Sequence, residues 1–134
     1  MFLQPKKLKY RKQRKGTLKN IEFKSNKLKF GEVGLKATQS GLVTARQIEA
    51  TRRAVVRKLN RKGKLWLRIF PQNPITKRPN ETRMGKGKGT VSFWGVKVAK
   101  GQILIEICGI PLKLAEEALT SGGYKLPIKT IVYY

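Results

Sequence analysis

Hydrophobic residues recur with a helical period in one stretch of the chain. Those that share one side of an ideal 3.6-residue wheel, within about 40°, are Ile48, Val55 and Leu59. Thr44 and Gln47 have the spacing of a capping box, in which each side chain satisfies a backbone donor at the helix start. Gly63 supplies a stop signal. The pattern predicts a helix over residues 44–63.

Other hydrophobic residues alternate with polar ones or form short blocks, which is typical of strands. The expected strands span residues 21–23, 28–35, 64–70, 91–98, 102–108 and 128–133. We expect Lys100 and Gly101 to join the fourth and fifth of these as a hairpin. Pro111 suits the first turn of a second, short helix that runs to about Thr120 and is closed by Gly122 and Gly123. The predicted fold class is α+β, with two helices packed on a mixed, mainly antiparallel sheet.

Aromatic residues and the lone cysteine fit this core. Packing in the core or on a sheet face is favoured over RNA stacking for Trp66, Phe70, Phe93 and Trp94. We expect Cys108 to be a small buried residue, since no supporting base for a reactive thiol is evident.

The segment 71–89 is too long for an ordinary turn, and it is too basic and glycine-rich to be buried. Its end, from Gly85 to Gly89, alternates glycine with lysine, so backbone and ammonium groups can lie together against an anion. The spacing matches neither a Walker loop nor a dinucleotide fingerprint. No helix is expected after it, so there is no helix dipole to hold a mononucleotide phosphate. We interpret it as a loop that contacts phosphate.

Charge identifies the kind of partner. The chain has 31 Lys and Arg against 7 Asp and Glu, a net charge of +24 over 134 residues. Such a protein binds polyanions, so nucleic acid is the expected partner. No apolar run approaches the roughly 20 residues that cross a bilayer, and a chain without His and with a single Cys offers no ordinary zinc ligand set. We expect no metal, no cofactor and no membrane contact.

The basic residues concentrate in three places: the N-terminal stretch, the predicted helix and the loop. Residues 1–19 are expected to form an arm that becomes ordered along RNA, and residues 20–134 a single RNA-binding domain that includes the loop. The arm residues expected to contact rRNA are Lys6, Lys7, Lys9, Tyr10, Arg11, Lys12, Arg14 and Lys15. A solvated tail or a targeting presequence is the alternative.

On the predicted helix, four arginines lie opposite the hydrophobic side. They are Arg46, Arg53, Arg57 and Arg61. A row of charges on a helix is often only solvated, but Glu49 is the one acid near these arginines, so a polyanion is expected to neutralise them.

Ordered blocks across nearly the whole chain carry a resemblance to a known family. They are Leu3–Lys6, Phe30-Gly31, Gly34–Ala37, Thr44–Ala50, Arg52–Ala54, Gly63-Lys64, Trp66, Arg68, Phe70-Pro71, Pro74–Thr76, Arg83–Gly89 and Lys125–Thr130. On these blocks the chain resembles the uL16 family of ribosomal proteins, the bacterial-type L16 of the large subunit.

The resemblance implies an α+β RNA-binding protein that docks among large-subunit rRNA helices near the 5S region and the A site. It implies a structural constituent without catalytic residues, which neutralises phosphates and helps to position A-site, and possibly P-site, tRNA near the peptidyl-transferase centre. Neighbouring ribosomal proteins are further implied partners. The residues that would contact tRNA or the adjacent rRNA are Arg78, Arg83, Met84, Gly85, Lys86, Gly87 and Lys88. In some bacterial members the arginine at the position of Arg83 is hydroxylated.

Residues 17–29 depart from the bacterial pattern by being rich in Lys and Asn. Together with a start that resembles the mature bacterial one, this favours a protein that is encoded and made in a mitochondrion over a bacterial protein. A plastid origin is favoured less. A free-standing RNA chaperone or tRNA-binding factor stays open as an alternative function. A nuclease is disfavoured because there is no His, and Glu81, the one acid in the basic loop, is more simply a charge partner of Arg83.

Overall fold

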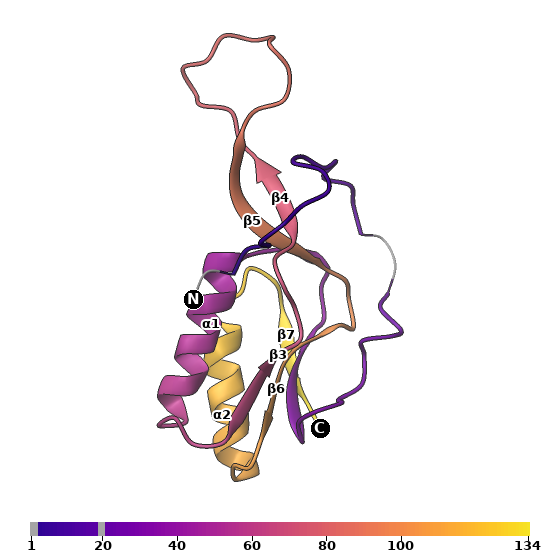
Figure 1. Ribbon diagram of the computed structural model, residues 1–134. Helices are drawn as coiled ribbons and strands as arrows, with labels where there is room; N and C mark the ends of the chain where they lie inside the picture. The colour runs from indigo at the N-terminus through magenta and orange to yellow at the C-terminus, as the bar shows by residue number, and fades with distance from the viewer. Residues whose placement is uncertain (1–2, 19–20) are drawn as a thin grey trace.

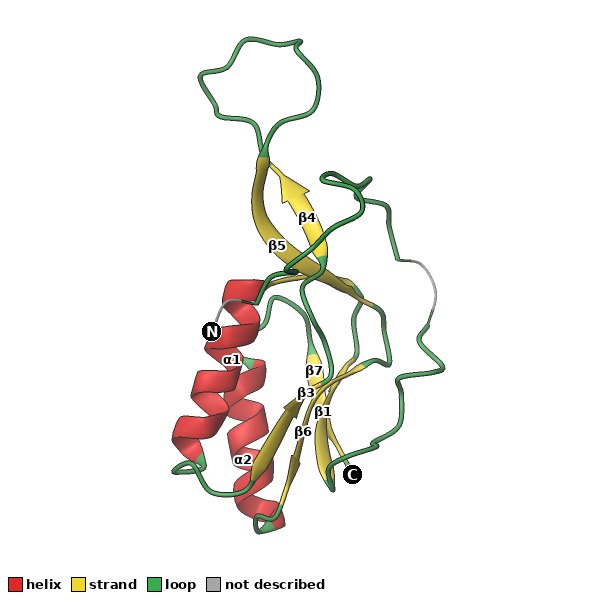
Figure 2. Ribbon diagram, in the orientation of Figure 1, coloured by secondary structure: helices red, strands yellow, loops and turns green. Residues whose placement is uncertain are grey.

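The computed structural model describes residues 3–18 and 21–134 (Figure 1). Residues 1–2 and 19–20, at the two ends of the predicted arm, lie outside the described residues. The elements in chain order are β1 (Val33–Ala37), β2 (Gly41–Thr44), α1 (Ala45–Lys58), β3 (Lys64–Leu67), β4 (Asn73–Thr76), β5 (Val91–Val98), β6 (Ile103–Cys108), α2 (Leu112–Gly123) and β7 (Thr130–Tyr133). The predicted α+β class with two helices is confirmed (Figure 2).

The strands form two separate antiparallel sheets where the sequence predicted one mixed sheet. One sheet has the order β3-β6-β1-β7 and the other the order β2-β5-β4. The predicted hairpin between β5 and β6 is therefore wrong, because these two strands belong to different sheets. Gly101, at a φ of 91°, turns the chain between them, and its N–H donates to Ala37 O at 2.7 Å. The sequence signal marked a real turn but could not say that it changes sheets.

Two short strands were missed, and other strand boundaries moved. Neither β2 nor β4 was expected, and β4 lies inside the predicted loop, which therefore covers residues 77–90. The predicted strand 64–70 ends at Leu67, and the predicted strand 128–133 begins at Thr130. Residues 21–23 form no strand; Ile21 makes only an isolated bridge with Lys100.

Helix α1 begins as predicted. The Thr44 side chain accepts from Gln47 N, and the Gln47 side chain accepts from Thr44 N at 2.9 Å, which completes the capping box. The helix ends at Lys58, five residues before Gly63. Asn60 adopts a φ of 50°, a left-handed conformation that asparagine tolerates, and so stops the helix early.

Helix α2 runs through both glycines that were expected to close it. At Gly122 an added Cβ would lie 2.5 Å from Val55 Cγ2 and 3.2 Å from Thr51 Cγ2. The glycine therefore serves the close approach of α2 to α1.

The core lies between the helices and the four-stranded sheet. Both helices stand on one side of this sheet, and α2 contacts β1 and β7 (Figure 1). The side chains of Leu35, Val55, Leu104 and Leu119 are at most 1% exposed. Leu3, at the start of the arm, belongs to the same buried cluster.

Candidate nucleic-acid interface

Helix α1 presents a basic face to solvent. Ile48, Thr51 and Val55 are buried on its inner side, and this fixes the direction of the outer side. Arg46, Arg53 and Arg57 are exposed on that outer side, as predicted. Arg61 lies beyond the helix, in the turn that follows Asn60, at a φ of 62°. It is exposed, but it does not extend the helical row.

Glu49 is already paired within the helix. Its carboxylate accepts from Arg52 Nη2 at 2.8 Å and from Arg53 Nε at 2.9 Å. The hydrogen bond from Arg52, joined by that from Arg53, outweighs partial burial and lowers the pKa of Glu49 to about 2. Within the described chain, Arg46 and Arg57 form no ion pair. The row therefore keeps uncompensated guanidinium groups at both ends.

A groove runs along this face of α1. Its volume is about 1030 Å3. The residues that line it are Leu3, Gln4, Thr44, Ala45, Arg46, Glu49, Ala50, Arg53, Ala54, Arg57, Ser92, Phe93, Trp94 and Lys125. It joins the arm, α1, β5 and the segment after α2, so arginines stand beside two partly exposed aromatic rings. Phe93 and Trp94, for which packing in the core or on a sheet face was favoured, thus also line the groove, and the contribution of Lys125 was missed.

Two other aromatic residues, predicted to pack in the core or on a sheet face, are also partly exposed. Trp66 is half-buried and Phe70 is 47% exposed. Cys108 is half-buried rather than buried, and its thiol donates to Glu32 Oε1 at 3.3 Å. That hydrogen bond raises the pKa of Cys108, which keeps the thiol protonated and unreactive.

The loop 77–90 extends from the β4–β5 hairpin, away from the rest of the molecule (Figure 1). Its residues Arg83, Lys86 and Lys88 are exposed, and Met84 is 92% exposed. Gly85 and Gly87 have φ angles of 102° and 79°, and nothing lies within 4 Å of an added Cβ at either. The alternating glycines thus leave open space beside the lysines.

Arg78 has a role inside this loop. Its Nη2 donates to Arg83 O at 2.7 Å and to Gly85 O at 2.9 Å. These bonds close the loop across its width, so part of the hydrogen-bonding capacity of Arg78 is used within the chain. The other charged residues of the loop are exposed.

The arm lies beside the loop. Lys12 Nζ donates to Lys88 O at 2.7 Å, and Lys88 Nζ donates to Gln13 O. The predicted arm residues, Lys6, Lys7, Lys9, Tyr10, Arg11, Lys12, Arg14 and Lys15, are all exposed. The structure thus brings residues 12–13 of the arm to the loop at Lys88, while the start of the arm, Leu3 and Gln4, lines the groove beside the arginines of α1.

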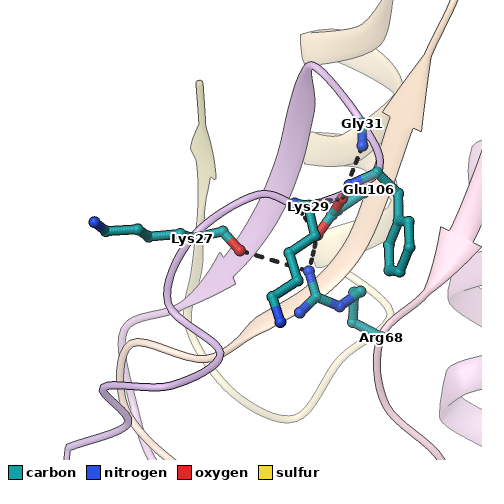
Figure 3. Close-up of polar contacts among 6 residues, drawn as sticks. Lys27, Lys29, Gly31, Arg68 and Glu106 are labelled. Carbon is teal, nitrogen blue, oxygen red and sulfur yellow. Dashed lines mark hydrogen bonds and ion pairs between the residues drawn. The ribbon is translucent and has the colours of Figure 1, made fainter.

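Sequence reasoning missed a buried ionic cluster under residues 27–31. Glu106 is fully buried on β6 and forms an ion pair with Arg68 (Figure 3). Its carboxylate also accepts from the backbone N–H of Lys29, of Phe30 at 2.7 Å and of Gly31 at 2.8 Å. Burial opposes ionisation, yet these bonds outweigh it and hold the pKa of Glu106 below its ordinary value. A single acid in the apolar run Ile103–Cys108 was the available signal.

Other classes of site find no support in the described part of the chain. Among residues 3–18 and 21–134, no group of three His, Cys, Asp or Glu residues is placed to hold a metal ion. No helix in these ranges is long and apolar enough to cross a membrane. The class that fold and site define is a small, strongly basic α+β protein with exposed cationic surfaces.

Comparisons with known proteins identify the family. A model of the family described as ribosomal protein L16p/L10e matches residues 5–133. The large ribosomal subunit protein uL16 of Maricaulis maris is 54% identical over 129 residues, which cover 96% of this chain and 94% of that protein. The uL16 protein of Azorhizobium caulinodans is 53% identical with the same coverage. The uL16c protein of Porphyra purpurea is 51% identical and covers 96% of this chain and 93% of that protein.

The chain therefore belongs to the ribosomal protein L16p/L10e family, a family of structural, non-enzymatic proteins. This confirms the resemblance seen in the sequence. The relatives named are bacterial and plastid proteins, so they give no support to a mitochondrial origin, which stays a prediction from residue usage.

Proposed function

We propose that the chain is a structural constituent of the large ribosomal subunit, bound to rRNA through α1 and the arm, and that its loop helps to position A-site tRNA. The curated relatives are large-subunit proteins of nearly the same length. The observation that carries the proposal is the separation of two basic regions along the β4–β5 hairpin (Figure 1). Arg46 and Arg57 are held on a packed helix, whereas Arg83 and Lys86 stand exposed on a distant loop.

The physical role is electrostatic. Arginine and lysine side chains neutralise RNA phosphates and release condensed counterions, which gives affinity without base-specific readout. The α1 groove adds Phe93 and Trp94, whose rings can stack on an unpaired base beside the arginines. The division into an arm of residues 1–19 and a domain of residues 20–134 belongs to the same proposal, with neighbouring ribosomal proteins as further partners.

The loop is tested by Arg83→Ala in reconstituted large subunits. We expect A-site tRNA affinity to fall about tenfold, the size of a lost hydrogen bond between charged groups, with the melting temperature of the free protein unchanged. Lys113→Ala, at an exposed site on α2, is the matched control. Unchanged tRNA affinity in the Arg83 variant, or a large loss of stability, would refute the role of the loop.

The alternative, a free-standing RNA chaperone or tRNA-binding factor, predicts a protein that exchanges on and off RNA. Sedimentation of native lysate through a sucrose gradient at high salt separates the two. Co-migration with the large subunit supports a ribosomal constituent, and release by moderate salt supports the exchanging factor. Performed on isolated organelles and on cytosol, the same gradient also tests the mitochondrial placement, which rests on the Lys- and Asn-rich residues 17–29.

A further inference from the structure

Residues 21–31, named here the cover segment, lie on the side of the four-stranded sheet that faces away from the helices (Figure 1). The segment contains no helix or strand, yet backbone bonds hold it along its length. Glu22 N donates to Lys100 O at 2.9 Å, and Ser25 O accepts from Ile103 N at 2.9 Å. The cover segment is therefore fixed to the sheet in advance of any ligand.

The buried Glu106 fastens the far end of the cover segment. It holds three consecutive backbone N–H groups, and Arg68 reaches both Glu106 and, at 3.5 Å, Lys27 O (Figure 3). At Gly31 an added Cβ would lie 2.7 Å from Ile107 O, so only glycine permits this approach to β6. Burying a carboxylate is costly unless its hydrogen bonds are complete. The ion pair and the three backbone bonds satisfy Glu106, and they fix the position of the cover segment.

What the cover segment presents outward is basic and aromatic. Phe23 is 77% exposed and Phe30 is 57% exposed. Between and beside them stand three exposed lysines, Lys24, Lys27 and Lys29. Phe30 is supported by Trp66, with ring centroids 6.1 Å apart, and by the Arg68 guanidinium, 5.4 Å from its ring.

The acids around these lysines are occupied elsewhere. The Glu22 carboxylate accepts from Lys24 N at 2.9 Å and from Ser25 N at 3.2 Å, and Glu106 is enclosed beneath the segment. Glu32 accepts from the Cys108 thiol. In the described ranges no acidic side chain forms an ion pair with the three lysines. Their charge faces solvent uncompensated.

We propose that the cover segment is a second RNA-binding surface, which takes unpaired nucleotides. Bases stack on Phe23 and Phe30, and the phosphates between them lie against Lys24, Lys27 and Lys29. Aromatic rings interleaved with cations bind single strands in this way, because every base has a face to stack. The surface lies on the other side of the sheet from α1, so one protein joins two RNA segments. The proposal goes beyond the proposed function and rests on it only in taking RNA as the partner.

The test is a fluorescence-anisotropy titration of the full chain with a labelled single-stranded oligouridylate, repeated over a range of salt concentrations. Phe23→Ala should weaken binding about tenfold, the usual effect of a lost stacking platform, without changing the salt slope. The double variant Lys24→Ala/Lys27→Ala should reduce that slope by about one to two. Tyr124→Ala and Lys113→Ala, both exposed and remote from the segment, are the matched controls.

The result that overturns the proposal is Phe23→Ala binding like Tyr124→Ala, with the lysine pair leaving the slope unchanged. Arg46→Ala/Arg57→Ala separates this failure from failure of the α1 site. A loss only in the arginine pair leaves α1 as the RNA site and removes the cover segment. A loss of RNA affinity only in the Phe23 and Lys24/Lys27 variants leaves the cover segment as the RNA site and removes α1. Normal RNA affinity with poor incorporation into particles would also refute RNA binding by the segment and identify a protein contact instead.

Discussion

The basic face of α1 and the loop 77–90 carry similar charge on very different supports. The arginines of α1 stand on a capped helix whose inner side is buried, so their spacing is fixed before binding. Around Gly85 and Gly87 nothing lies within 4 Å of an added Cβ, and the bonds from Arg78, with those between Lys88 and the arm, hold the shape of the loop. Ordering side chains and backbone on binding costs free energy. The comparison teaches that α1 suits permanent contact, whereas the loop suits a partner that arrives and leaves.

The largest loss of stability should come from removing the Arg68–Glu106 ion pair, which holds the cover segment, residues 21–31, to the sheet. Arg68→Ala leaves the Glu106 carboxylate buried without its ion-pair partner, so we expect the free energy of unfolding to fall by about 3–5 kcal/mol. Urea denaturation measures it, with Lys113→Ala as the exposed control. A loss of less than about 1 kcal/mol would mean that the three backbone N–H groups suffice for Glu106. The ion pair between Arg68 and Glu106 would then contribute little to the stability of the fold.

Two glycine substitutions with effects of intermediate size compare the loop with a segment that is packed on the sheet. Gly31→Ala places a Cβ 2.7 Å from backbone on β6, so the cover segment must shift, at a cost of about 1–3 kcal/mol. Gly85→Ala meets no neighbour and is strained only by its φ of 102°, so we expect about 1 kcal/mol or less in a loop that can relax. Thermal melts of the two variants are the measurement. Equal losses would show that the loop is as tightly held as the segment.

The smallest effect is a pH dependence on α1. The pKa of Glu49 is lowered from 4.5 to about 2, so its ion pairs stabilise the fold above about pH 4.5 and the contribution is lost as pH falls toward 2. The pair is partly exposed, so the contribution is about 1 kcal/mol or less. The stability difference between the native chain and Glu49→Gln should therefore shrink on acidification from pH 5 to pH 2. A difference that stays constant would show that the pairs do not stabilise the fold.

Local signals in the sequence predicted local structure well. The Thr44 and Gln47 pair placed the start of α1 correctly, because a capping box is complete within four residues. The end of α1 was predicted at Gly63 and the end of α2 just before Gly122, and both were wrong because a glycine alone does not show whether a helix ends there. A glycine that ends a helix and a glycine that admits a neighbouring helix look alike in a sequence, and only the 2.5 Å approach to Val55 distinguishes them.

The candidate interface was predictable where charge is dense and unpaired. The arm and the loop were found from composition, and both are exposed as expected. The pairing of Glu49 with Arg53 was visible as an i, i+4 spacing, but the choice of Arg52 as the second partner was not. The division into two sheets depends on pairings between strands that are not neighbours in sequence, such as β2 with β5 and β1 with β6, and the burial of Glu106 depends on contacts with backbone groups more than 70 residues away. No periodicity within either segment encodes them.

One residue joins the two basic regions mechanically. Thr44 is at once the last residue of β2 and the N-cap of α1, and β2 pairs with β5, whose far end carries the loop. No linker separates the strand from the helix, so the direction of the helix axis is tied to that of the hairpin. The β2–α1 junction thus sets the spacing between the arginines of α1 and the base of the loop. A ligand bound to the arginines of α1 would then lie at a defined distance from the base of the loop.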